Sequence, residues 1–134
     1  MKGRVRWSHV TIALALIAAA IAGPLSTAHA HNVTFKSIVE IDGYQTIGAF
    51  IGAVGSFENS KCSRARVVTV WKRNPGAMDG PFGTAKTNRA GRWRLEVTAP
   101  AANYYATVKK KAIRRKRGHR HVCSYDRSSN FRVL

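Results

Sequence analysis

The clearest strand signal in the chain is Arg92-Trp93-Arg94-Leu95-Glu96-Val97. Charged and apolar residues alternate there without a fault, and successive side chains of a strand point to opposite faces. The pattern therefore predicts a half-buried strand that directs Trp93, Leu95 and Val97 into a core. The preceding Asn88-Arg89-Ala90-Gly91 favours a turn. Together with residues 84–87, these segments predict a tight hairpin.

The same period of two recurs along most of the chain. In residues 33–41 most odd positions are apolar, whereas Lys36 and Glu40 fall on the opposite face. Further strands are predicted at residues 50–54, 67–71, 103–108 and 130–133. No stretch of residues 31–134 has the 3.6-residue apolar stripe of a helix. About seven strands in this length predict one all-β domain, a Greek-key sandwich of two sheets.

The first thirty residues have the three parts of a secretory signal peptide. Residues 1–7 are basic, residues 10–22 form an apolar run, and Ala28-His29-Ala30 has the small residues at −3 and −1 that signal peptidase reads. The apolar run is shorter than the roughly 20 residues that cross a bilayer as a helix. We therefore expect residues 1–30 to be cleaved and residues 31–134 to be secreted, without a transmembrane segment, and either free or associated with the cell wall. Cleavage after Ala28 is the alternative.

The expected export of the protein determines how its two cysteines, Cys62 and Cys123, are interpreted. Outside the cytoplasm an even number of cysteines indicates a disulfide. Their separation closes a long loop, for which the chain-entropy model gives about 4 kcal/mol of stabilisation. Without clustered histidines or acids the pair is a poor zinc site. We therefore expect one structural disulfide between Cys62 and Cys123.

Net charge is the strongest compositional feature. The chain has 23 Lys and Arg residues against six Asp and Glu. Three of the basic residues and none of the acids lie in residues 1–30, so residues 31–134 carry a formal charge of +14. The densest part is residues 109–121, where eight of thirteen residues are basic. They are Lys109, Lys110, Lys111, Arg114, Arg115, Lys116, Arg117 and Arg120.

Such a basic segment attracts polyanions by Coulomb steering and counterion release. Outside the cell the candidate partners are anionic wall polymers, acidic polysaccharides and membrane surfaces. Aromatic residues that would stack bases are not interleaved with the charges, which argues against specific nucleic-acid binding. The alternative is a solvated hairpin loop whose charge keeps a sheet edge from pairing with other molecules. The sequence leaves both interpretations open.

Two alternative binding functions rest on fewer residues. Cleavage after Ala30 would make His31 the N-terminal residue, and its amine and imidazole with His119 or His121 would supply nitrogen donors that suit copper. Surrounding positive charge opposes this copper site, and no other cofactor is indicated. A small carbohydrate-binding module is the other alternative, with Trp71, Tyr44 and Tyr105 as a sugar-stacking platform.

No catalytic pattern is present in the sequence. The six acids, Glu40, Asp42, Glu58, Asp79, Glu96 and Asp126, are scattered, and no pair of them suggests a glycosidase couple. No serine lies in a nucleophile elbow. We therefore expect a protein that is not an enzyme.

A resemblance extends over most of residues 48–134. Its motifs are Gly52-x-x-Gly55-Ser56, Cys62, Arg66-Val67-Val68-x-Val70, Thr87 to Trp93, Tyr104-Tyr105-Ala106, Cys123 and Phe131-x-Val133. Together they resemble the small transthyretin-like domains, related to the regulatory domain of carboxypeptidases, of exported bacterial proteins. The resemblance implies a cross-linked Greek-key sandwich that serves in adhesion, in carbohydrate or protein contact, or in packing beside other domains. Asn88 stands where that family most often has Asp, and either residue supports an Asx-type turn.

Overall fold

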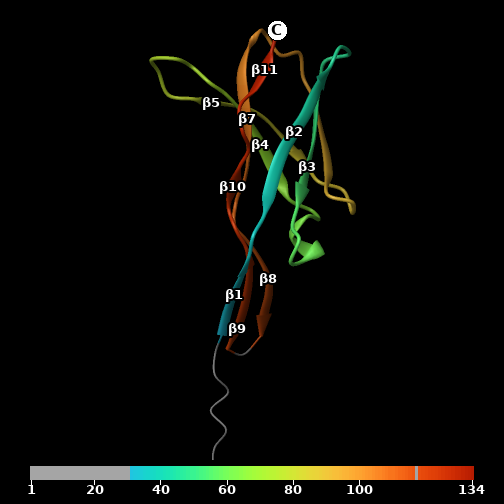
Figure 1. The fold of residues 1–134 in the computed structure, drawn as a ribbon, viewed down its shortest axis with the longest axis vertical. Helices are drawn as coiled ribbons and strands as arrows, with labels where there is room; N and C mark the ends of the chain where they lie inside the picture. Colours follow the sequence, from blue (N-terminus) through green and yellow to red (C-terminus); the bar gives the residue numbers. More distant parts are fainter. Residues whose placement is uncertain (1–30, 117) are drawn as a thin grey trace, which may run out of the picture.

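The computed structural model describes residues 31–116 and 118–134; the expected signal peptide and Arg117 lie outside them. In the described residues all regular elements are strands apart from one short 3-10 helix, η1 (Figure 1). The elements are β1 (His31–Phe35), β2 (Ile38–Gln45), β3 (Ala49–Gly55), η1 (Ser60–Cys62), β4 (Val67–Lys72), β5 (Gly80–Lys86), β6 (Arg92–Glu96), β7 (Ala102–Val108), β8 (Lys111–Lys116), β9 (His119–Cys123), β10 (Asp126–Arg127) and β11 (Phe131–Val133).

Two of the sheets form a β-sandwich. One sheet has the order β2-β3-β6, and the other has the order β10-β7-β4-β5, with β11 also paired to β7. Because β3 pairs with β6 and β4 pairs with β7 across intervening strands of the chain, the connectivity is that of a Greek key. The sequence prediction of an all-β sandwich is confirmed.

The core lies between these two sheets and consists of the residues on their inward faces. Trp93 is 3% exposed, and Leu95 and Val97 pack against the core, as the alternation in β6 predicts. Gly52 on β3 is required there, because a Cβ atom at this position would lie 2.4 Å from the Trp93 ring. The buried members of the core are Val39, Phe50, Val54, Val68, Val70, Trp93, Tyr104, Ala106, Val108 and Val133.

The hairpin predicted for residues 84–97 is wrong. β5 pairs with β4 and β6 pairs with β3, so the two segments belong to opposite sheets. The Asx-type turn nevertheless forms, because Asn88 Oδ1 accepts hydrogen bonds from Ala90 N at 2.9 Å and Arg92 N at 3.0 Å. Apolar side chains of the two strands meet across the core, where Leu95 contacts the backbone at Gly83. The turn therefore connects the two layers of the sandwich.

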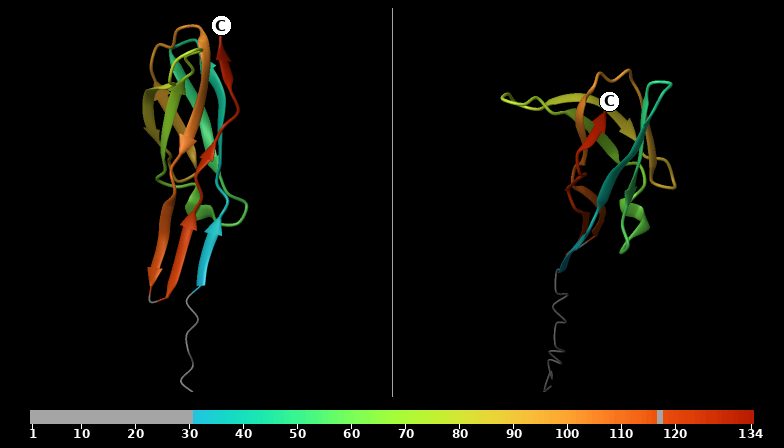
Figure 2. Two further views of the ribbon diagram at one scale, coloured as in Figure 1. Left: turned by 90° about the vertical axis from the view of Figure 1, so that its left-hand side faces the viewer. Right: turned by 45° about the horizontal axis from the view of Figure 1, so that its top comes forward.

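A third sheet was not predicted. It has the order β1-β9-β8 and extends beyond one end of the sandwich, away from the C-terminus (Figures 1 and 2). The strand expected at residues 33–41 is therefore two strands, β1 and β2, that separate at Lys36 and Ser37. The expected loop at residues 109–121 is also wrong: it contains β8 and β9, which pair antiparallel. Together with the short β10, these strands raise the count in the described residues to eleven, above the seven expected.

Candidate anionic-polymer interface

The third sheet, which we call the basic sheet, brings together most of the basic residues that the sequence singled out. Its strands contain Lys111, Arg114, Arg115, Lys116 and Arg120 and no acidic residue. Lys109 and Lys110 are exposed in the connection from β7 to β8. Figure 2 shows its three strands side by side beyond the sandwich. The side chains of Arg114, Arg115, Lys116 and Arg120 are exposed, whereas Lys111 is half-buried.

Cross-strand register divides the charges between both faces of the basic sheet. Arg114 pairs with His121 and Lys116 with His119, whereas Arg115 pairs with Arg120 and therefore points to the other face. Two like charges directly opposite each other destabilise a strand pair. A bound anion would offset this repulsion, so the Arg115–Arg120 face is the more favourable place for a polyanion.

A shallow depression of about 460 Å³ lies at the outer end of the basic sheet. Its lining residues are Asn32, Arg115, Lys116, Gly118, His119 and Arg120. Three of the six are permanently cationic and none is acidic.

Protection of a sheet edge explains only some of the basic residues on the basic sheet. β8 is an edge strand of the basic sheet, and its lysines and arginines discourage pairing with other molecules. β9, however, is the central strand, paired on both sides by β1 and β8. Arg120 lies on β9 and therefore protects no edge. Its position beside Arg115 favours a binding role for that face.

Arg66 joins the basic sheet to the sandwich. Its side chain is 2% exposed. Nη1 donates to Ser37 Oγ at 3.0 Å and Cys62 O at 2.6 Å, and Nη2 donates to Lys109 O at 2.7 Å and Ser124 O at 3.2 Å. Ser37, Lys109 and Ser124 are the three points at which the chain passes between sandwich and basic sheet. One guanidinium therefore fixes all three connections, a role that no sequence pattern indicated.

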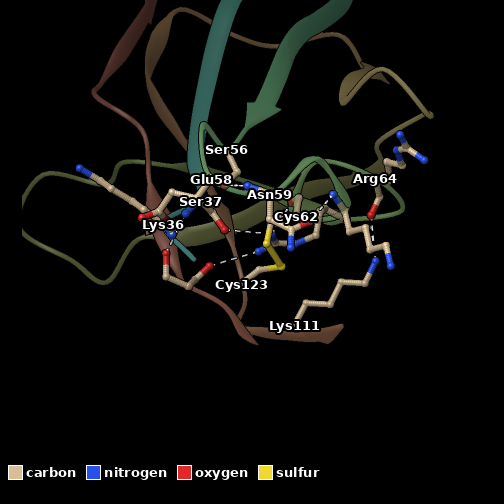
Figure 3. The surroundings of a disulfide bond; sticks show 12 residues. Lys36, Ser37, Ser56, Glu58, Asn59, Cys62, Arg64, Lys111 and Cys123 are labelled. Atoms are coloured by element: carbon tan, nitrogen blue, oxygen red, sulfur yellow. Dashed lines mark hydrogen bonds between the residues drawn. A yellow bond between two sulfur atoms is a disulfide. The ribbon is translucent and has the colours of Figure 1, made fainter. Parts of the chain in front are cut away.

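The expected disulfide is present beside this junction. Cys62 in η1 and Cys123 at the end of β9 are fully buried, with Cα atoms 5.4 Å apart (Figure 3). The bond links the connection between β3 and β4 to the central strand of the basic sheet. Disulfide and Arg66 together attach the basic sheet to the sandwich at a defined position.

The three candidate histidines lie on one face of the basic sheet. His31 pairs in register with His119, with His119 Nδ1 3.4 Å from His31 Nε2. The His31 and His121 ring centroids are 5.9 Å apart. Even so, among the described residues no group of three or more histidines, cysteines or acids is arranged to hold a metal ion. The copper site also needs a free amine at His31, outside what the structure describes, and it stays a prediction.

The three aromatic residues do not form an open sugar platform. Trp71 and Tyr105 are cross-strand neighbours on β4 and β7 with nearly parallel rings 6.2 Å apart. Arg127 covers the Tyr105 ring at 3.8 Å from its centroid, and Tyr105 is only 8% exposed. Tyr44 lies on β2 in the other sheet and packs against Phe50.

The acidic residues take part in local contacts. Asp42 pairs with Arg92 at 2.7 Å and Glu96 with Arg94 at 3.1 Å. Glu58 and Asp126 accept backbone hydrogen bonds from Lys36 and Val39. These acids are thus spread over the sandwich and its junction.

Neither a scan against protein-family models nor a search among curated proteins finds a match to this chain. The β-sandwich is a property of the structure, whereas membership of the transthyretin-like family stays a prediction. In the described part of the chain no helix is long and apolar enough to span a membrane.

Proposed function

We propose that this protein is a secreted, non-catalytic module that binds anionic polymers of the cell envelope or the surrounding medium through its basic sheet. The observation that carries the proposal is the Arg115–Arg120 pair, which lines one depression together with Lys116, on a projecting sheet whose strands contain no acid. Attraction to a polyanion follows from the release of its counterions and needs no deep pocket.

The fixed position of these charges favours binding, in addition to their number. The disulfide and the Arg66 hydrogen bonds hold the basic sheet in place, so its cations are ordered before a ligand arrives. Less conformational entropy is then lost on binding than with a flexible basic tail. The sandwich, in this proposal, is the support that presents the basic sheet.

A charge-matched pair of triple variants tests this proposal on immobilised heparin. Arg115→Gln, Lys116→Gln and Arg120→Gln together are expected to lower heparin affinity roughly a hundred-fold, at on the order of 1 kcal/mol per cation near an anionic surface. The measurement is the salt concentration at which each protein elutes and the dissociation constant at fixed salt.

The control removes the same number of charges from the opposite end of the sandwich. It carries Lys72→Gln, Arg73→Gln and Arg132→Gln, which lie at the end of β4, just after it, and on β11. We expect its affinity to stay within about three-fold of the wild type, since screened charges act over roughly 8 Å at physiological salt. Equal losses in the two triple variants would show that net charge, and not the basic sheet, determines binding.

Heparin affinity is also expected to rise as the pH falls from 7.5 to 5.5. Histidine gains its positive charge in this range, and His121 lies on the basic sheet opposite Arg114. Partial desolvation and then the charge of Arg114 lower the pKa of His121, so this ring gains its proton later than an ordinary histidine. The other groups whose charges lower the pKa of His121 are His31, His119 and Lys61.

The sign of the pH effect follows from linkage. A bound polyanion stabilises the protonated His121 ring, so protons are taken up on binding and the affinity increases at lower pH. The expected increase is roughly two- to three-fold, less than one pKa unit of coupling, because His121 lies on the face opposite Arg115 and Arg120. Sulfate groups stay ionised throughout this range, so the change reports on the protein. His121→Gln should remove most of it, and an unchanged pH profile in that variant contradicts the assignment.

A further inference from the structure

A hollow lies where the basic sheet meets the sandwich. Its volume is about 580 Å³, within the roughly 300–1,000 Å³ of small-molecule sites. A lone inorganic anion is much smaller than this. The lining residues are Ala65, Arg66, Val67, Thr69, Thr84, Lys109, Lys110 and Lys111.

The lining combines three kinds of chemistry. Lys109, Lys110 and Lys111 are three of its basic lining residues, and no acid is among the lining residues. The Lys111 ammonium donates to Arg64 O at 2.8 Å, so Lys109 and Lys110 are the lysines without such a contact among the described hydrogen bonds. Thr69 and Thr84 are paired across β4 and β5, so their hydroxyls lie side by side on the outer face of the sandwich. Val67 and Ala65 add apolar surface.

Positive charge in this hollow is not neutralised by the protein. The four hydrogen-bond partners of the Arg66 side chain are carbonyl and hydroxyl oxygens, none of them charged. Burial, and then the charges of Arg66 and Lys86, lower the pKa of Lys111. An anion in the hollow would offset this repulsion, because it attracts every one of these cations.

We propose that this hollow binds one anionic sugar unit, a ring that carries a carboxylate or sulfate group. The lysines would take the anionic group by charge-assisted hydrogen bonds, and the two threonine hydroxyls would take hydroxyls of the ring. Val67 would contact the apolar C–H face of the ring. Each class of lining residue then has a partner on the same ligand.

The inference rests on the proposed function and makes it more specific, since it selects acidic polysaccharide among the anionic polymers. Lys111 begins β8, and this strand leads from the hollow to Lys116 at the outer end of the basic sheet. At 3.3 Å per residue the two residues are roughly 17 Å apart. A short acidic oligosaccharide could therefore occupy the hollow with one unit and lie along the basic sheet with the next ones.

The test is an NMR titration of the ¹⁵N-labelled secreted protein with glucuronate. We expect the amide signals of Val67, Thr69, Thr84 and residues 109–111 to shift along one saturating curve. Glucose lacks the charge, inorganic sulfate lacks the ring, and glycerol phosphate represents a phosphodiester polymer. Each of the three should bind at least about ten-fold more weakly than glucuronate, a difference of 1.4 kcal/mol. Equal or tighter binding of any one of them overturns the assignment to an anionic sugar.

Two charge-matched variants locate the site. Lys109→Gln with Lys110→Gln should raise the glucuronate dissociation constant at least about ten-fold, whereas Arg115→Gln with Lys116→Gln, which removes the same charge, should change it less than about two-fold. Thr69→Val with Thr84→Val keeps all charges and should abolish the preference for glucuronate over sulfate. Thermal midpoints within a few degrees of the wild type show that each variant is folded. If Lys109→Gln with Lys110→Gln changes the glucuronate dissociation constant no more than Arg115→Gln with Lys116→Gln does, the proposed pocket is wrong.

The outcome also separates this inference from the proposed function. If heparin is retained by the basic sheet but glucuronate leaves the hollow unchanged, the inference fails and the proposed function stands. If heparin affinity does not depend on the basic sheet, the proposed function fails whatever glucuronate does.

Discussion

Replacing Cys62 and Cys123 together by alanine is expected to lower the free energy of unfolding by about 4 kcal/mol. The disulfide spans a sequence separation of 61 residues, so its loss returns a large amount of conformational entropy to the unfolded chain. Both cysteines are also fully buried, and the smaller alanine side chains leave space at the junction. The loss is a large fraction of the 5–15 kcal/mol typical of a domain.

Urea unfolding followed by tryptophan fluorescence measures this loss. The wild-type protein under a thiol reductant provides an independent comparison, because it breaks the bond without changing the sequence. We expect the double alanine variant and the reduced wild-type protein to be destabilised to a similar extent. A loss below about 1 kcal/mol in both would mean that the disulfide does not connect the basic sheet to the sandwich in the way the structure shows.

Arg66→Met is expected to lower the free energy of unfolding by about 3–5 kcal/mol, because several buried oxygens lose their charged donor at roughly 1–3 kcal/mol each. Methionine has a similar length but no donors, so the carbonyls of Cys62, Lys109 and Ser124 lose their charged partner. The three connections to the basic sheet would then be separated from one another. Hydrogen exchange should therefore accelerate more in β8 and β9 than in β3.

Arg64→Met is the matched control for this substitution. Arg64 is exposed, two residues from Arg66, and an exposed substitution of this kind usually changes stability by less than about 0.5 kcal/mol. Arg66→Lys keeps the charge but loses the planar arrangement of donors, so an intermediate loss is expected. Equal stability of the Arg66 and Arg64 methionine variants would contradict the role of Arg66 at the junction.

Sequence periodicity predicted the sandwich because apolar residues alternate along a strand when one face of that strand packs against the opposite sheet. Trp93 lies in the core because β6 has one face toward the opposite sheet, and the alternating pattern records that face directly. The disulfide was predictable from the number of cysteines and the expected compartment. The Asx-type turn at Asn88 was predictable from local chemistry alone.

Pairing partners were not predictable in the same way. A turn between two strands is compatible with a hairpin and with a connection between layers, and only contacts distant in sequence, such as Leu95 against Gly83, decide between them. The basic segment resembled a loop because its charges occur in consecutive runs, at residues 109–111 and 114–117, which hide the alternation of β8. Arg66 gave no signal, since its burial depends on carbonyls as far away as Ser124.

The central claim is that the basic sheet is the surface that binds anionic polymers. Its most direct test is the NMR footprint of a heparin oligosaccharide on the ¹⁵N-labelled protein at physiological salt. We predict that the largest amide shifts fall in residues 109–116 and 118–121, in β8 and β9 and the connection before them, with little change in β2, β3 and β11. A footprint centred on Lys72, Arg73 and Arg132 at the other end of the sandwich, or spread evenly over all cations, would contradict the account.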